Sequence, residues 1–221
     1  MTSILDSFQQ EIPRAVHYKR GDNPRTHAGG ALTRESQPPF SGIELPVRLW
    51  LDDADEILEN GDVRDELSRH FLPSWTERFF GSEGDVADAA TLQFTHPVDL
   101  ALTVAHGGKI LSMAEYTAVI GEANNERVRS DRLWLTLPDE ASIEDVRRQV
   151  NPPLRGCFAV SDFKKRNAIR VDEIDAATVD WVDVGNMALS DSLFKSNSLE
   201  FLKQAVSYAY SFGTKYISVF D

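Results

Sequence analysis

Histidine, cysteine and carboxylate side chains supply most of the acid, base and metal-ligand groups in proteins, and here they form no recognisable motif. The five histidines are spread along the chain, at His17, His27, His70, His96 and His106. Cys157 is the only cysteine, so an internal disulfide bond or a thiolate metal cluster is excluded. It lies in an apolar run, residues 156–160, where we expect it to be buried. The sequence therefore predicts no catalytic residue, no metal and no cofactor, and it favours a protein that is not an enzyme.

The segment His106-Gly107-Gly108-Lys109 is the best candidate for a ligand-binding site. We expect it to connect a strand to a helix, where two glycines can expose backbone N–H groups to an anion. Lys109 would add a positive charge to such a site. The spacing matches neither a P-loop nor a dinucleotide-binding fingerprint. A plain flexible loop is the alternative interpretation of the same residues.

A second candidate is the basic segment Lys164-Lys165-Arg166. We expect it at the tip of a hairpin, where long cationic side chains are exposed to water. A contact with an acidic partner, including the acidic half of a second copy of the chain, is the functional interpretation. A solvated tip without a partner is the alternative.

The net charge of −12 is concentrated in one part of the chain. Residues 1–41 carry five basic and four acidic side chains, and residues 127–221 carry thirteen and fourteen. Residues 42–126 carry five basic and seventeen acidic side chains. The electrostatic field of that middle part repels phosphate groups, so generic binding of DNA or RNA is disfavoured.

A nine-residue segment occurs twice. Residues 48–56 read Arg-Leu-Trp-Leu-Asp-Asp-Ala-Asp-Glu, and residues 132–140 read Arg-Leu-Trp-Leu-Thr-Leu-Pro-Asp-Glu, with six identities. Weaker similarities follow in the same order, which indicates an internal duplication. We expect Trp50 and Trp134 to fill equivalent core positions. The acidic pairs at the ends of both segments would terminate strands; binding of a cation by both is the alternative.

Secondary-structure patterns predict two copies of one unit, over residues 42–128 and 129–221. In the first copy we expect a strand at 47–51, a helix from 62 to Pro73, strands at 91–95 and 100–105, and a helix at 112–123. In the second copy we expect a strand at 132–137, a helix from 142, a hairpin of 157–163 and 168–174, a strand at 178–184, a helix from Ser198 to Gly213 and a last strand at 216–220. This order is typical of a ferredoxin-like arrangement. The sequence thus predicts an α+β protein of two ferredoxin-like lobes, one acidic and one balanced in charge.

Residues 1–41 differ from the rest in being rich in proline and glycine without regular periodicity. A short helix is expected near residues 3–10, and an extended N-terminal arm after it. Arms of this composition become ordered when they lie across a partner.

The duplication, the uneven charge and the N-terminal arm concern the architecture and the surface of the protein, and none of them is a catalytic motif. We interpret the protein as a structural or assembly subunit of a larger complex, such as a virus or phage particle, with protein partners or self-association. The alternatives are a small-ligand-binding or regulatory module with a site between the lobes, an RNA-processing protein, and an acidic mimic of DNA. The chain has no apolar run long enough to span a membrane and no secretory signal in its first residues. We therefore expect a cytoplasmic location or a place in an assembled particle.

Overall fold

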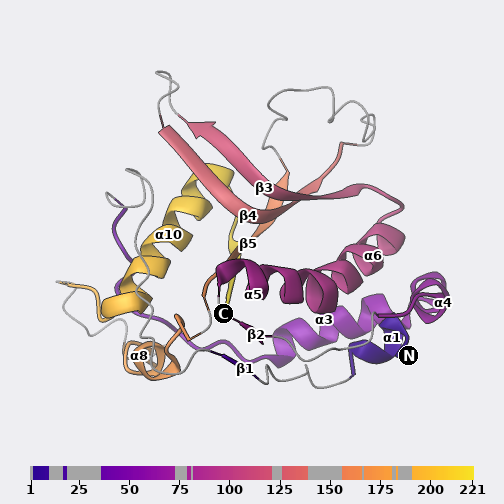
Figure 1. Cartoon of the computed structure of the whole chain (residues 1–221), viewed down its shortest axis with the longest axis horizontal. Coiled ribbons are helices and arrows are strands. Elements are labelled where there is room, and N and C mark those ends of the chain that lie inside the picture. Colours follow the sequence, from indigo (N-terminus) through magenta and orange to yellow (C-terminus); the bar gives the residue numbers. More distant parts are fainter. Residues whose placement is uncertain are drawn as a thin grey trace.

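The protein has an α+β fold with a four-stranded mixed sheet at its centre (Figure 1). The computed structural model describes residues 2–9, 17–18, 36–72, 79–80, 82–120, 126–138, 156–165, 167–180, 183 and 191–221. The helices are α1 (Ile4–Ser7), α3 (Arg48–Glu59), α4 (Gly61–Arg69), α5 (Glu83–Ala90), α6 (His96–Ala105), α8 (Val171–Asp175) and α10 (Ser196–Phe212), with a π-helical segment η1 (Thr91–Thr95) between α5 and α6. The strands are β1 (His17–Tyr18), β2 (Phe79–Phe80), β3 (Ile110–Ile120), β4 (Glu126–Thr136), β5 (Cys157–Phe163) and β6 (Tyr216–Phe220).

The central sheet has the strand order β3-β4-β5-β6. The first three strands pair antiparallel, whereas β6 pairs parallel with β5. Two parallel neighbours need a crossover connection, and α10 lies in the connection between β5 and β6. A short parallel pair, β1 with β2, lies outside this sheet.

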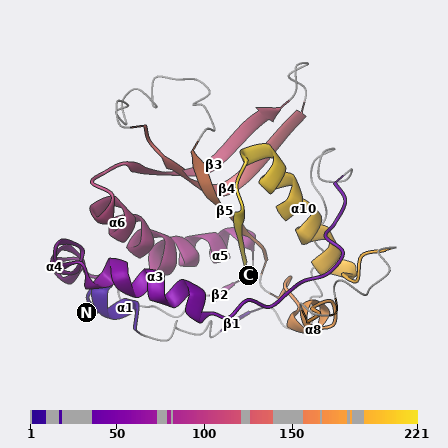
Figure 2. The same cartoon turned by 180° about the vertical axis from the view of Figure 1, so that it is seen from behind.

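Helices cover the sheet on two sides, as the front and back views show (Figures 1 and 2). Successive side chains of β5 point to opposite faces, as in any strand. Val160 belongs to an apolar cluster with two aromatic side chains of α10, Tyr208 and Phe212. Phe163 lies near Phe220 with ring centroids 5.8 Å apart, and Phe94 of η1 approaches the same ring at 5.6 Å. The α5–η1–α6 segment therefore covers the face opposite α10.

A second apolar cluster joins the start of the chain to α4 and α6. Its buried members are Ile4, Val63, Leu67, Leu72 and Ala101. The Ile4 N–H donates to the His70 carbonyl at 2.8 Å, and the Leu72 N–H donates to the Thr2 carbonyl at 3.1 Å. The expected short helix exists as α1, but this beginning of the predicted arm packs onto the protein's own core.

Within residues 42–128 most of the expected elements are wrong. Residues 48–59 form the helix α3 and not a strand, and residues 91–105 form η1 and α6 and not two strands. Buried side chains at 86, 89, 90, 97 and 101 recur at intervals typical of one face of a helix. The expected helix at 112–123 is wrong over residues 112–120, which belong to β3, because pairing with β4 overrides the local preference. The expected helix after residue 62 is confirmed as α4, although Asn60 caps it.

Within residues 129–221 the predictions fare better. Strands β4, β5 and β6 and the helix α10 are confirmed, and Gly213 ends α10 in the left-handed conformation with φ 65°. The second strand of the expected hairpin is wrong, because residues 171–175 form α8. In the expected strand at 178–184, Thr178 forms an isolated bridge with Gly42, and several later residues lie outside the described part. The helix expected from residue 142 also lies outside it.

The internal duplication is not confirmed. The four strands β3 to β6 form a single sheet, and the expected boundary between copies, at residue 128, falls inside β4. Trp134 is 8% exposed, as expected of a core residue, but Trp50 is 48% exposed. Among the helices that the structure describes, none is long and apolar enough to cross a membrane.

Candidate functional site

The turn at residues 106–109 does not have the geometry that an anion site needs. It follows the helix α6 and precedes the strand β3, the reverse of the expected order. Gly107 and Gly108 have φ of 58° and 77°, and their N–H groups donate to the Val104 and Thr103 carbonyls of α6. The Lys109 N–H donates to the His106 carbonyl. The N–H groups of Gly107 and Gly108 therefore cap the negative end of a helix and do not face an anion as expected. Ligand binding at His106, Gly107, Gly108 and Lys109 stays a prediction.

The basic segment at 164–166 is also placed differently from the prediction. Lys164 is not at an exposed tip: it is 7% exposed, and its N–H donates to the Phe220 carbonyl next to β6. Lys165 is half-buried, and Arg166 lies outside the described residues. A lysine is rarely buried without a charged or polar partner. The partners of Lys164 therefore identify the residues of a candidate site at this end of the sheet.

Lys164 belongs to a closed network of four buried or partly buried side chains. Its ammonium group lies 2.5 Å from Oδ2 of Asp162 and donates to Oε1 of Gln204 at 2.8 Å. The amide of Gln204 donates to the Tyr208 hydroxyl, and this hydroxyl donates to Oδ1 of Asp162 at 3.0 Å. Gln204 and Tyr208 lie one turn apart on α10. Asp162 lies in β5 and Lys164 directly follows this strand, two residues from Asp162, so the members of each pair lie on the same side.

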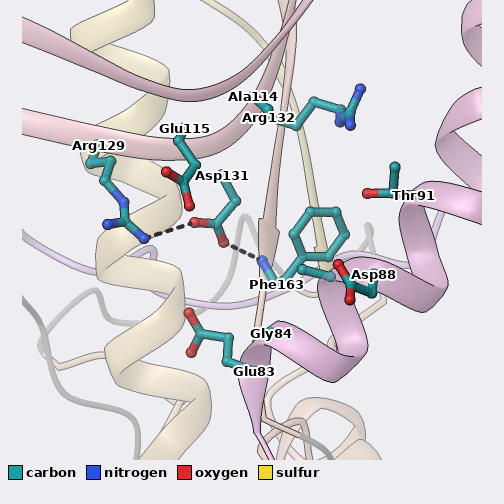
Figure 3. Close-up of a pocket in the computed structure, with 11 residues that line it drawn as sticks. Glu83, Gly84, Asp88, Thr91, Ala114, Glu115, Arg129, Asp131, Arg132 and Phe163 are labelled. Carbon is teal, nitrogen blue, oxygen red and sulfur yellow. Dashed lines mark hydrogen bonds and ion pairs between the residues drawn. The ribbon is translucent and has the colours of Figure 1, made fainter. Parts of the chain in front are cut away.

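Asp131 brings a second carboxylate to this network from the neighbouring strand. The last pair before it in the β4–β5 register is Arg132 with Ser161, so continuing the register places Asp131 across from Asp162. Its Oδ2 accepts the Phe163 N–H at 2.7 Å, and Oδ1 lies 3.7 Å from the Arg129 guanidinium (Figure 3). Two strands thus hold two carboxylates beside one lysine.

The backbone is irregular at the same place. In the β3–β4 ladder Ala114 pairs with Arg132 and Tyr116 with Ser130, but Glu115 and Asp131 between them do not pair. Glu115 has φ 50°, which is uncommon for a residue with a side chain. The faces of β4 exchange here, because Val128 and Leu133 pack in the same apolar cluster. Such interruptions re-aim side chains and occur often at functional sites.

A pocket of about 320 Å³ opens between α5 and the sheet at this irregularity (Figure 3). Its charged lining residues are Glu83, Asp88, Glu115, Arg129, Asp131 and Arg132. Glu83 is the first residue of α5, which begins with a capping box between Ser82 and Asp85. The pocket is therefore acidic in the middle, with an arginine on the α10 side and another beside Thr91 on the opposite side.

The electrostatics couple the pocket to the buried network. Burial raises the pKa of the Asp162 carboxyl to about 6; Asp131 adds to the shift, and Lys164 opposes it. Burial also raises the pKa of Glu83, which Lys164 and Arg129 oppose and Asp131 increases. Burial, with Asp162 adding, raises the pKa of the Tyr208 phenol, which therefore stays protonated and donates its hydrogen bond. Asp131 and Lys164 thus act on both Glu83, which lines the pocket, and Asp162 of the buried network.

These carboxylates are hard oxygen ligands, the type that Mg²⁺ prefers. Within the described part of the chain no three histidine, cysteine or acidic side chains lie close enough together to hold a metal ion. Mg²⁺ is often bound by one or two carboxylates, with water and substrate phosphates completing its coordination. Asp131 and Asp162 could supply these two carboxylates, and Asp131 lines the pocket.

The sequence interpretation missed every residue of this site except Lys164. A usable signal was present: Asp162 and Lys164 flank Phe163 at the end of a strongly apolar strand, where charged side chains need partners. Gln204 and Tyr208 have helical spacing on the face that also carries Phe212. Their convergence with Asp131 depends on the sheet register, which the sequence pattern did not supply.

No family model, curated protein or solved structure matches this chain.

Proposed function

We propose that the protein is a divalent-cation-dependent hydrolase that cleaves phosphodiester bonds of a nucleic acid. The observation that supports this most is the buried ion pair of Asp162 and Lys164 beside Asp131, which itself lines an acidic pocket. A buried ion pair adds little stability in itself, because desolvation offsets the attraction between its charges. Carboxylates for a cation together with a fixed ammonium group are, in contrast, what phosphoryl transfer uses.

Each residue has a separate role in this proposal. Asp131 and Asp162 would hold the cation, which would supply activation of water and polarisation of a phosphoryl oxygen. Water forms the new bond to phosphorus as the bond to the leaving oxygen breaks, and solvent accepts and returns the protons. Lys164 stabilises the negative charge that develops on the phosphoryl oxygens. Gln204 and Tyr208 are positioning residues that hold Lys164 and Asp162.

The net charge of −12 has to be reconciled with an anionic substrate. The exposed acidic side chains of α3 and α4 belong to the part of the chain with the large negative charge. The proposed ligands and Lys164 lie in β4 and β5, in the part whose charges nearly balance. Generic binding remains disfavoured, so the proposal predicts weak binding without cations and cation-bridged binding at the pocket.

The test is cleavage of fluorescently labelled single-stranded and double-stranded DNA and RNA in Mg²⁺ or Mn²⁺. Cleavage should disappear with EDTA and in Asp162→Asn and Lys164→Met. Asp172→Asn, an exposed acidic residue of α8, is the matched control and should retain full activity. If pure protein cleaves none of the four nucleic acids with either cation, or the Asp162→Asn variant cleaves as the wild type does, the proposal is wrong.

An assembly subunit is the second candidate, and an exposed apolar surface favours it. Leu45, Val47 and Leu51 are 54%, 63% and 52% exposed, and Trp50 contacts Tyr216 edge to face at 5.6 Å. Adjoining exposed apolar side chains often mark a protein contact. Light scattering after size-exclusion chromatography should show oligomers that the double variant Leu45→Ser and Leu51→Ser loses. A wild-type monomer at all concentrations, together with no recovered partner, would contradict it.

A further inference from the structure

Arg132 has an arrangement that the fold alone does not explain. It follows Asp131 on β4 and lines the pocket at the side of Thr91 (Figure 3). Its guanidinium donates to Oδ2 of Asp99 at 3.1 Å and to Oγ of Ser112 at 2.8 Å. Both bonds use the same nitrogen, Nη1. Trp134 Nε1 donates to the other oxygen of Asp99 at 2.6 Å, so the carboxylate that holds Arg132 is itself fixed.

The remaining edge of the guanidinium has no acceptor among the described residues. Nε of Arg132 is buried and has no hydrogen-bond partner among the described residues. A buried donor without a partner is costly, and more so on a charged group. Structural arginines usually satisfy these donors with a carboxylate in a two-pronged contact. Here Asp99 and Ser112 occupy one nitrogen, which orients the guanidinium and leaves the rest of its fork unused.

We propose that Arg132 binds a phosphate group of the substrate, next to the phosphate held at Asp131 and Asp162. The planar guanidinium matches two phosphate oxygens, and it remains charged at every pH of interest. A pocket that holds carboxylates in the middle and Arg132 at one side suits a substrate with at least two phosphates. This inference rests on the proposed function and adds a subsite to it: Arg132 holds a phosphate that neighbours the one that is cleaved.

The hydrogen bonds of Nη1 also distinguish Arg132 from Arg129, the other arginine of the pocket. Arg129, at the other side of the pocket, is 60% exposed and lies 3.7 Å from Asp131. It is free to turn toward solvent, whereas the Arg132 side chain is 13% exposed and anchored. A preorganised cation loses less conformational freedom when it binds an anion.

Binding of inorganic phosphate and of a nucleoside 5′-monophosphate tests the proposal, measured by calorimetry in EDTA at low salt. Arg132→Lys keeps the charge facing Asp99 but loses the fork, and we expect affinity to fall about tenfold. Arg69→Lys, on the exposed face of α4, should bind like the wild type. Ser112→Ala removes one anchor, keeps the arginine, and should give an intermediate loss. Ser112→Ala also tests the proposal if the Arg132→Lys protein does not fold.

Cleavage kinetics then separate this inference from the proposed function. In an active enzyme, Arg132→Lys should raise KM for an oligonucleotide more than it lowers kcat. Phosphate binding that depends on Arg132 in a protein without nuclease activity would retain the anion site and reject the hydrolase. Nuclease activity with unchanged phosphate affinity and KM in both Arg132→Lys and Ser112→Ala would reject the anion site alone.

Discussion

The same four residues, Arg-Leu-Trp-Leu, form a helical turn at 48–51 and part of a central strand at 132–135. In α3 the tryptophan and last leucine, Trp50 and Leu51, are about half exposed. In β4 their counterparts Trp134 and Leu135 are 8% and 3% exposed. This tetrapeptide, with three apolar residues of four, therefore does not determine its own secondary structure or burial.

Their neighbours along the chain and in space account for the difference. After Leu51 the chain continues with acidic residues and then Ile57 and Leu58, which pack against the cluster around Ile4 and Val63. That spacing favours a helix with one apolar side. After Leu135 the chain reaches Pro138, and both edges of β4 pair with other strands. The residue before each tetrapeptide also differs: Val47 precedes α3, whereas Asp131 lies within β4.

The largest expected effect concerns that preceding residue. Asp131→Val places a valine before Arg-Leu-Trp-Leu in β4, as Val47 stands before the same residues in α3. The change also removes a proposed cation ligand. Nuclease activity should fall at least about a hundredfold, as when a charge-stabilising group is removed from an active site. Asp131→Asn should show nearly the same loss with less risk to folding. Retained activity in a folded Asp131→Asn protein would remove Asp131 from the site.

A large effect on stability should separate the two copies of the last leucine. Leu135→Ala leaves a cavity in the sheet core and should lower the free energy of unfolding by about 3 kcal/mol. Leu51→Ala removes an exposed side chain and places alanine in a helix, so the change should stay within about 0.5 kcal/mol. Chemical denaturation of both variants measures the difference. Equal losses would mean that Leu51 is covered in solution, as the assembly proposal requires.

The pH dependence should divide activity from stability at the site on β4 and β5. Because the pKa of Asp162 is raised to about 6, cation binding and cleavage should fall about tenfold per pH unit below that value. The folded protein holds this proton more tightly than the unfolded chain does. The contribution of Asp162 to stability is therefore greatest at low pH and is lost as pH rises from about 4 to about 6.

This prediction needs two measurements, because Lys164, Asp131, Tyr208 and Glu83 all face the same network. Activity and cation affinity should be followed from pH 4.5 to 8, and thermal unfolding over the same range. Asp162→Asn should remove the rise in unfolding free energy toward low pH. Activity that stays constant from pH 5 to 7 would contradict an essential ionised Asp162.

The smallest expected effect concerns the two tryptophans. Trp134→Phe loses the hydrogen bond to Asp99 and should cost about 1–2 kcal/mol, in line with a bond to a charged group. Trp50→Phe keeps an aromatic ring near Tyr216 and should cost less than about 0.5 kcal/mol. Thermal unfolding of the two variants tests this order. The reverse order would show that the helical copy is the more tightly packed of the two.

Several parts of the fold were predictable because their determinants are local. Gly213 after an amphipathic stretch, and the β-branched and aromatic residues at 216–220, predict the end of α10 and the strand β6. The burial of Cys157 followed from its apolar run and is confirmed. The failures at 47–51, 91–105 and 112–123 share a cause: short apolar segments fit both periodicities, and packing decides between them.

The site was less predictable than the fold. Lys164 was singled out for its charge, but the local pattern suggested a solvated tip. Its burial depends on Asp162, on Gln204 of α10 and on the Phe220 carbonyl of β6. Asp131, Asp162, Gln204 and Tyr208 come from three elements that are distant in the sequence. No spacing rule within one element could connect them.

By itself, the sequence determined the α+β composition, the uneven distribution of charge, the last helix and strand, and the presence of two similar tetrapeptides. Only the tertiary structure decided that one tetrapeptide is a helix and the other a strand, and that Asp131, Asp162 and Lys164 meet beside a pocket. The physical reason is the distance along the sequence over which the determining interactions act. Turns, caps and charge depend on a few neighbouring residues, whereas register and burial depend on partners that chain folding brings together from far apart.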